Sequence, residues 1–201
     1  MKSGSTYNNN IRRWFHFLSI SAFGLFLWIS SFPTELVTTY LGIITCIFIC
    51  LDLLRIHTPY LNGLASDWFS FLLRKHEMYS LSGSSWFLIS ALLSLSLFSK
   101  PLVILGFFYL AIGDPLASYI GIKFGSKQIG EKTWVGFFGF FIPCTLVGIF
   151  WLLQIVELKM AIIAAVNSAL VAGLCEKFVN EMDDNLLTPL ASSLVATLIL
   201  I

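Results

Sequence analysis

Long apolar runs separated by short polar stretches constrain this chain more than any other feature. An α-helix needs about 20 mostly apolar residues to cross a bilayer, and seven runs approach or reach that length. Of the 201 residues, 57% are hydrophobic and 11% are charged, and a soluble domain of this size cannot bury so much apolar surface. The sequence therefore predicts an all-α integral membrane protein with about seven transmembrane helices. The expected spans are 14–31, 36–54, 86–99, 102–122, 134–156, 160–175 and 186–201.

Two segments differ from these spans. In 64–79, apolar residues such as Leu64 and Trp68 alternate with charged ones such as Asp67 and Arg74. This pattern favours an amphipathic helix in the membrane interface, and a solvated loop is the alternative. Residues 1–11 are polar and are expected to form a mobile tail. Residues 12–201 are expected to form a single membrane domain that carries the catalytic groups.

The cations indicate the orientation in the membrane. With seven spans, Lys100 and Lys159 lie on one side and the remaining ten lysines and arginines on the other. The positive-inside rule then places the N-terminus in the cytoplasm and Ile201 outside. Nine of the eleven acids share the cytoplasmic side, which predicts a catalytic face there. The membrane would be the cell (inner) membrane of a prokaryote or the endoplasmic reticulum of a eukaryote. Twelve cations against eleven acids exclude a typical nucleic-acid-binding protein.

An acid within the fourth expected span is the first candidate for chemistry. On a helix at 100° per residue, Ala117, Ser118, Gly121 and Gly125 all fall within about 60° of Asp114. An intramembrane carboxylate is costly and is usually functional. The strip of small residues is also explained by close helix packing, so both interpretations stay open for it.

The next loop, 125–133, nearly spells a phosphate-binding P-loop. Glu131 separates its second glycine from Lys132, and no strand precedes it, so the P-loop interpretation fails. Backbone N–H groups at a helix N-terminus nevertheless favour anions. Lys132, Thr133 and Gly136 are therefore candidates to hold phosphate oxygens, whereas Lys127 fits an ordinary positive-inside lysine.

An acidic cluster spans 176–185. If the preceding helix continues, Glu176, Asn180 and Asp183 share one face at i, i+4 and i+7. Such dense oxygen ligands suit Mg²⁺, which binds one or two carboxylates together with substrate phosphates. A solvated acidic loop is the alternative. Asp184 and Asn185 run directly into the last apolar span, which makes solvation alone less convincing for them.

Basic residues open the first span. Arg12 and Arg13 satisfy the positive-inside rule and can also bind phosphates bidentately. His16 lies one turn into the apolar run, where burial without a partner is costly. Glu77 precedes the third span and is a weaker candidate for the same site.

Taken together and in this order, the motifs resemble those of the polyprenol kinase family. The pattern is Arg-Arg-x-x-His, then Gly-Asp-x-x-Ala-x-x-x-Gly-x-x-x-Gly, then Lys-Thr-x-x-Gly, then Glu and a later Asp-Asp-Asn-x-x-x-Pro. It covers residues 12 to about 192. The family includes dolichol kinase, phytol and farnesol kinases and CTP-dependent diacylglycerol kinase, and it is distantly similar to phosphatidate cytidylyltransferase.

The resemblance implies transfer of the γ-phosphate of a nucleoside triphosphate, usually CTP, to the hydroxyl of a membrane lipid alcohol. That alcohol would be a polyprenol, another isoprenoid alcohol or diacylglycerol. By position, the family's basic pair falls on Arg12 and Arg13, its acid on Asp114 and its glycine on Gly121. The nucleotide-binding loop and the final acidic motif fall on the following residues: Lys132, Thr133, Gly136, Asp183, Asp184 and Asn185.

The expected mechanism needs positioning and charge neutralisation more than covalent chemistry. Asp114, Asp183 and Asp184 are expected to hold Mg²⁺, and Glu176 or Asp114 to accept the hydroxyl proton. Gly125 and Asn185 join the nucleotide-binding residues. A cytidylyltransferase acting on a lipid phosphate and a small membrane transporter are the alternatives, and the small-residue faces are compatible with a homodimer.

Overall fold

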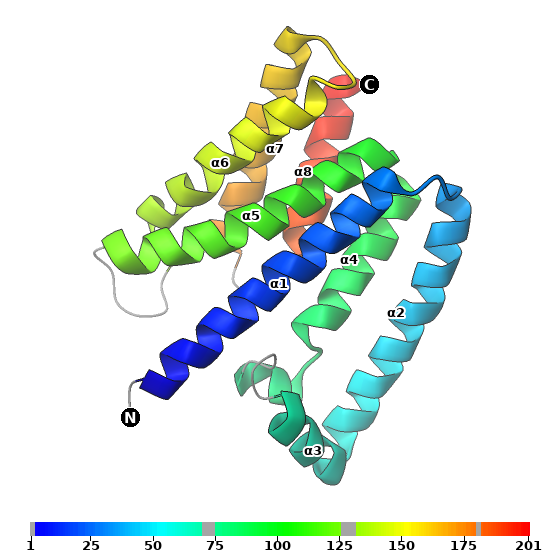
Figure 1. Cartoon of the computed structure of the whole chain (residues 1–201), viewed down its shortest axis with the longest axis vertical. Helices are drawn as coiled ribbons and strands as arrows, with labels where there is room; N and C mark the ends of the chain where they lie inside the picture. Colours follow the sequence, from blue (N-terminus) through cyan, green and yellow to red (C-terminus); the bar gives the residue numbers. More distant parts are fainter. Residues whose placement is uncertain (1–2, 70–74, 126–131, 180–181) are drawn as a thin grey trace.

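The chain is all-helical in the part that the structure describes. The computed structural model describes the backbone of residues 3–69, 75–125, 132–179 and 182–201, and the side chains from residue 14 onward in these ranges, except 75 and 76. No strand occurs in these ranges. The elements (Figure 1) are α1 Ser3–Ile29, α2 Thr34–His57, α3 Pro59–Phe69, the 3₁₀ helix η1 Lys75–Tyr79, α4 Gly83–Leu97, α5 Lys100–Phe124, α6 Trp134–Leu152, α7 Leu158–Phe178 and α8 Asp184–Leu200.

Four of these helices are long and apolar enough to cross a membrane, namely α2, α5, α6 and α7. Three shorter apolar helices are α4, α8 and the Trp14–Ile29 part of α1. Each expected span therefore corresponds to a helix, and the predicted all-helical fold is confirmed for the described residues. The long apolar helices are consistent with a membrane protein. The count of seven spans stays a prediction.

Two boundaries differ from those expected. α1 begins at Ser3, so its backbone is helical through most of the segment expected as a tail, and the mobility of that segment stays a prediction. The single interfacial helix expected at 64–79 is replaced by α3 and η1, with 70–74 outside the described residues. α3 buries none of its residues, and Trp68 is 74% exposed, as expected for a helix in the membrane interface.

The central helix of the bundle is α5. It packs against α1, α6 and α8, and Figure 1 shows it running between them. Gly106 permits the close approach of α8, because a Cβ at this position would lie only 2.8 Å from the backbone oxygen of Pro189. Small residues at such crossings are typical of helices that pack within a membrane.

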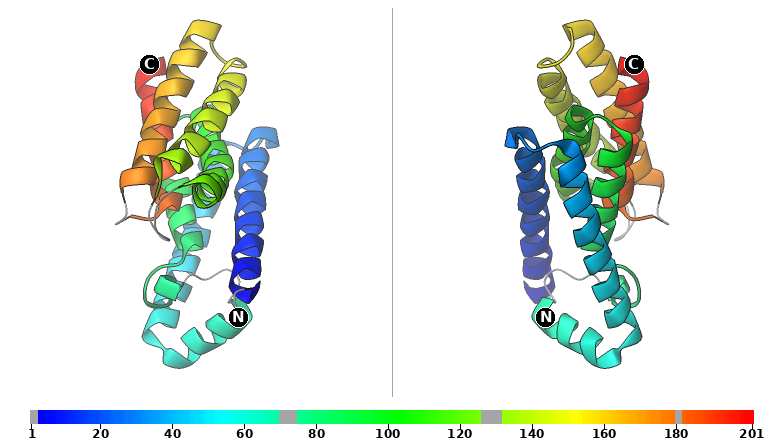
Figure 2. Two further views of the ribbon diagram at one scale, coloured as in Figure 1. Left: turned by 90° about the vertical axis from the view of Figure 1, so that its left-hand side faces the viewer. Right: turned by 90° about the vertical axis from the view of Figure 1, so that its right-hand side faces the viewer.

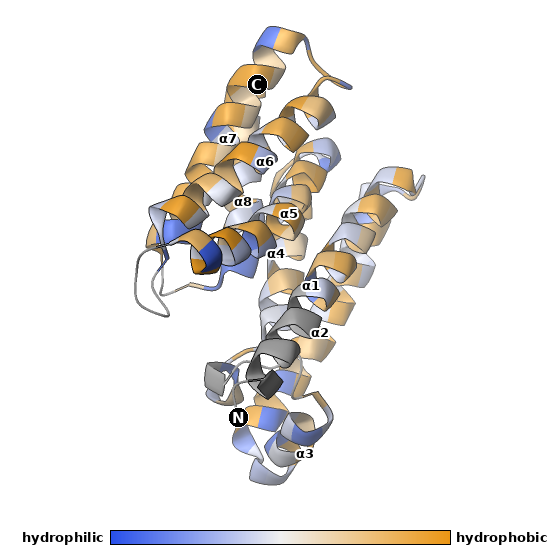
Figure 3. Ribbon diagram, turned by 60° about the vertical axis from the view of Figure 1, so that its left-hand side comes forward, coloured by the Kyte–Doolittle hydropathy of each residue, from blue (hydrophilic) through white to orange (hydrophobic). Residues whose placement is uncertain are grey.

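The outward faces of the helices are apolar. Large exposed hydrophobic side chains include Ile43 on α2 and Leu146 and Phe150 on α6, and Figure 3 shows hydrophobic colour along the outside of α6 and α7. Several hydroxyls lie inside, and Ser90 of α4, for example, donates to the carbonyl oxygen of Leu186 at 3.0 Å. An apolar exterior around an interior with hydroxyl-mediated contacts fits a lipid surrounding.

The helix ends on the side of the N-terminus do not all lie at the same height in the bundle. α1 and α2 extend beyond the last turn of α7 and the first turn of α8, and α3 crosses near their far ends (Figure 2). The last turn of α7 and the first turn of α8 thus lie beside the middle of α5 rather than beside its end. This arrangement positions the candidate site.

Candidate active site

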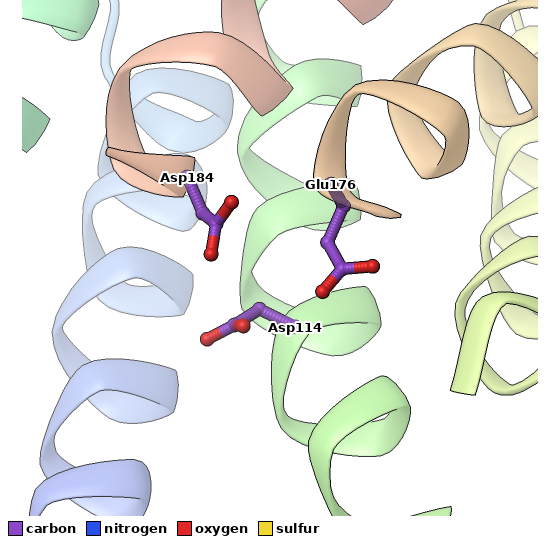
Figure 4. A group of neighbouring side chains, drawn as sticks. All are labelled: Asp114, Glu176 and Asp184. Atoms are coloured by element: carbon purple, nitrogen blue, oxygen red, sulfur yellow. The ribbon is translucent and has the colours of Figure 1, made fainter. Parts of the chain in front are cut away.

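Three carboxylates from three helices converge beside the middle of α5. Asp114 of α5, Glu176 of α7 and Asp184 of α8 each offer an oxygen, and these oxygens lie within 4.8 Å of one another (Figure 4). Glu176 is in the last turn of α7 and Asp184 is the first residue of α8. Asp114 precedes the end of α5 by ten residues, which is about 15 Å along the helix at 1.5 Å per residue.

Lys132 contacts two of these acids. Its Nζ lies 2.8 and 3.0 Å from the two carboxylate oxygens of Asp184 and 3.3 Å from Oε1 of Glu176, and it also donates to the backbone oxygen of Glu176. Burial lowers the pKa of Lys132, but attraction from Asp184 and Glu176 outweighs this effect, so its pKa is raised overall. The ammonium group therefore stays charged.

The charges of this group do not balance. Three acids face one ammonium group in a largely buried place, and close carboxylates repel one another unless a cation or a proton intervenes. Mg²⁺ binds oxygen at 2.0–2.1 Å, so opposite ligands lie about 4.2 Å apart. Adjacent ligands of an octahedron lie only about 2.9 Å apart, so three oxygens within 4.8 Å of one another can reach one ion by side-chain movement. The donor set therefore fits Mg²⁺.

The membership of this group differs from the expected metal ligands. Asp114 and Asp184 belong to it, but the third acid is Glu176 and not Asp183. α7 ends at Phe178 and Val179 is extended, so the condition for the shared face of Glu176 and Asp183, a helix that continues to residue 183, is not met. Asp183 instead caps α8 by accepting a hydrogen bond from the backbone N–H of Asn185 at 2.9 Å. Asn180 lies outside the described residues.

The glycines place Lys132. Thr133 caps α6 by accepting from the backbone N–H of Gly136 at 3.0 Å. A Cβ at Gly121 would lie 3.1 Å from Oγ1 of Thr133, and a Cβ at Gly125 only 2.8 Å from Cγ2 of the same residue. These glycines therefore let the end of α5 approach the start of α6, which leaves Lys132 beside α7 and α8.

Close packing is thus one role of the small-residue strip, and phosphate binding there stays a prediction. The residues 126–131 of this loop, with Lys127, lie outside the described residues.

The other predicted residues lie around the carboxylates. Asn185 is buried, and its side-chain amide donates to the backbone oxygen of Gly83 at 3.2 Å, so it joins α8 to the start of α4. Glu77 is also buried, and its carboxylate lies, like the amide of Asn185, next to Gly83 at the start of α4. His16 is half-buried on α1. Arg12 belongs to α1, as does Arg13, and both side chains are outside the described part. The roles assigned to these residues stay predictions.

Lys177 is a neighbour that sequence reasoning missed. Its Nζ lies 4.5 Å from the centre of the Trp134 ring and 3.5 Å from the backbone oxygen of Lys132. Cation–π contact and this hydrogen bond hold the start of α6 against α7. The sequence did indicate its location, because Lys177 directly follows Glu176 and so lies at the same end of the same helix.

Comparison with known proteins relates the chain to one protein over most of its length. The uncharacterized protein RP860 of Rickettsia prowazekii is 31% identical over 172 residues, which cover 83% of each chain. The chain belongs to the family of this Rickettsia protein. No family model matches the chain, and no solved structure matches it.

Two kinases are similar over a shorter part. CTP-dependent diacylglycerol kinase 1 of Saccharomyces cerevisiae is 29% identical over 114 residues, which cover 48% of this chain and 39% of the kinase. The kinase of the same name from Eremothecium gossypii is 27% identical over 110 residues, covering 46% and 35%. This partial similarity relates the chain to lipid kinases at the level of the family. The chain spans well under half the length of either kinase.

Proposed function

We propose that this protein is a CTP-dependent kinase that phosphorylates the hydroxyl of a membrane lipid alcohol at the cytoplasmic face. The acceptor would be a polyprenol, another isoprenoid alcohol or diacylglycerol. The observation that carries the proposal is the meeting of Asp114, Glu176 and Asp184 with Lys132. The partial similarity to two CTP-dependent diacylglycerol kinases supports CTP as the donor.

Phosphoryl transfer requires alignment of the reactants and neutralisation of phosphate charge. The acceptor oxygen forms a bond to the γ-phosphorus, the bond to the β–γ bridging oxygen breaks, and CDP leaves. A carboxylate of Asp114 or Glu176 takes the proton that the hydroxyl loses. Both belong to the group of three acids, and of these two candidates only Glu176 also contacts Lys132.

The carboxylates of Asp114, Glu176 and Asp184 would hold Mg²⁺. When bound, Mg²⁺ supplies neutralisation of the triphosphate charge. Lys132 would contribute a further positive charge to the phosphate oxygens, since its Nζ already lies within 3.3 Å of two of the acids. The N–H groups at the start of α6 beside Thr133 favour an anion at the same place.

The position of the site within the bundle also fits a lipid acceptor. Asp114 lies about 15 Å before the end of α5, so the acids are recessed among the helices rather than displayed on an outer loop. A lipid hydroxyl approaching from the bilayer reaches this level without leaving the membrane. A soluble acceptor gives no reason for placing the acids there.

Labelled nucleotides test the proposal directly. Purified protein is incubated with Mg²⁺, with γ-labelled CTP or ATP, and with a panel of lipid alcohols. The expected product is a labelled lipid phosphate formed from CTP. Asp114→Asn is expected to abolish it, whereas Asp67→Asn, the same change at an exposed site on α3, is the matched control.

The same assay separates the alternatives. Incorporation of an α-labelled CMP group into a lipid, with release of pyrophosphate, would show a cytidylyltransferase instead. Absence of any labelled lipid, with both donors and all acceptors, would refute both enzymatic activities and favour a transporter.

A further inference from the structure

A buried ion pair lies outside the candidate active site, near the end of α2. Oδ1 of Asp52 accepts from Nε of Arg55 at 3.1 Å and from Nη2 at 3.0 Å. Both residues are buried, with 8% and 6% of their surface exposed. An isolated buried pair adds little net stability compared with apolar residues of similar volume. Its other contacts therefore indicate what it does.

Arg55 holds the segment that follows α3. Its Nη1 donates to the backbone oxygen of Glu77 at 3.0 Å, and its Nη2 donates to that of Ser80 at 2.9 Å. Nη1 also donates to Oδ1 of Asn62, whose amide donates to the backbone oxygen of Met78 at 2.9 Å. Three backbone carbonyls in and just after η1 are thus fixed by one guanidinium group and its neighbour.

Asp52 holds the start of α4 with its other oxygen. Oδ2 accepts from the backbone N–H of Ser82 at 2.7 Å, from its hydroxyl at 2.8 Å and from the hydroxyl of Ser85 at 2.7 Å. Ser82 is the residue that caps α4. We call the set Asp52, Arg55, Ser82 and Ser85 the α4 latch, since its contacts hold the first turn of α4 and the residues just before it.

The first turn of α4 contacts the first turn of α8. The backbone oxygen of Gly83 accepts from the Asn185 amide at 3.2 Å. The fit is close, because a Cβ at Gly83 would lie 2.8 Å from Nδ2 of Asn185 and 3.5 Å from Oε1 of Glu77. Asn185 directly follows Asp184, so a continuous series of contacts joins the latch to one of the three carboxylates.

We propose that the α4 latch is a positioning device for the candidate active site. It fixes the start of α4, which through Gly83 and Asn185 fixes the start of α8, and so it sets where Asp184 meets Asp114. Its predicted effect on catalysis rests on the proposed function. Partners that hydrogen-bond directly to metal ligands typically change metal affinity or activity by 10- to 100-fold when they are removed, and the latch would act on Asp184 through Gly83 and Asn185.

Breaking the latch with Asp52→Ala tests this proposal by two readouts. The first is the Mg²⁺ concentration that gives half-maximal phosphoryl transfer, which is expected to rise at least 10-fold. The second is the mobility of a nitroxide at Met182→Cys, measured by EPR with the four native cysteines replaced. Met182 is 55% exposed and lies just before α8, so the label is expected to become more mobile.

The matched control is Lys100→Met. Nζ of Lys100 donates to the backbone oxygen of Ser30 at 2.8 Å, so this change also removes a tertiary contact, but at the start of α5 and away from the carboxylates. It is expected to leave both readouts unchanged. If Asp52 only stabilised the fold, Asp52→Ala would lower the amount of active protein and leave the half-saturating Mg²⁺ concentration as it was.

Gly83→Ala tests the same connection from the other side. Its Cβ would press on Asn185, so it is expected to raise the half-saturating Mg²⁺ concentration and the label mobility as Asp52→Ala does. It also provides the test if Asp52→Ala protein does not fold. Changes along one path are not additive, so the double variant is expected to match the more severe single variant. Additive effects, or an unchanged label and an unchanged Mg²⁺ dependence, would overturn the proposal. If wild-type protein transfers no phosphate, the proposed function fails, and the label mobility still decides on the latch.

Discussion

Replacing Lys132 with methionine removes the ammonium group that faces the acids and keeps most of the aliphatic stem. Loss of a charge-assisted contact costs about 1.5–3 kcal/mol, and each 1.4 kcal/mol corresponds to a factor of ten. We therefore expect kcat/KM for the nucleotide to fall by about 10- to 100-fold in a labelled-CTP assay. Lys127→Met changes a lysine of the same loop and is expected to have little effect.

The same substitution also changes stability in a way that Mg²⁺ should reverse. Glu176 and Asp184 then lose their ammonium partner. Breaking a fully buried ion pair costs about 3–5 kcal/mol, and this one is partly exposed at Lys132, whose side chain is 27% exposed, so we expect a loss of roughly 1–3 kcal/mol. Without the competing ammonium group, Mg²⁺ should raise the Tm of Lys132→Met protein in detergent more than that of wild type. Equal activity losses in the Lys132 and Lys127 variants, together with no additional Mg²⁺ effect on Tm, would refute this reasoning.

Three further outcomes are expected. Asp114→Asn should fold normally and lose at least about 100-fold in turnover, because a metal ligand is removed, and a kinetic assay with excess lipid should show no rescue. Gly121→Ala should lower Tm by several degrees, since its Cβ would lie 3.1 Å from the threonine that caps α6. Gly63→Ala should not lower Tm, because nothing lies within 4 Å of its Cβ position, and thermal unfolding in detergent compares the two variants. Cysteine labelling in intact vesicles should find positions Lys132 and Ile201 on opposite sides, and reaction from the same side would contradict the orientation.

Several features of this protein follow from the sequence alone because they depend on local properties. Apolar runs of sufficient length form helices wherever the backbone polar groups must be satisfied internally, so each expected span corresponds to a helix of the structure. Thr133 was identified at the start of the helix that it caps. Asp114 was identified as an acid inside a span, and its cost in that setting is a property of the residue and the run around it.

The tertiary structure decided which acids meet. Spacing would place Glu176 and Asp183 on one face only if the helix of Glu176 continued, but α7 ends at Phe178 and Asp183 caps α8. Where a helix ends in a charged segment depends on how the next helix packs, and the spacing of residues in the sequence does not contain that information. Likewise, nothing near Asp52 in the sequence indicates Ser82 or Ser85. Their contacts exist because α2 and α4 pack side by side, and a buried carboxylate must find its donors wherever the packing brings them.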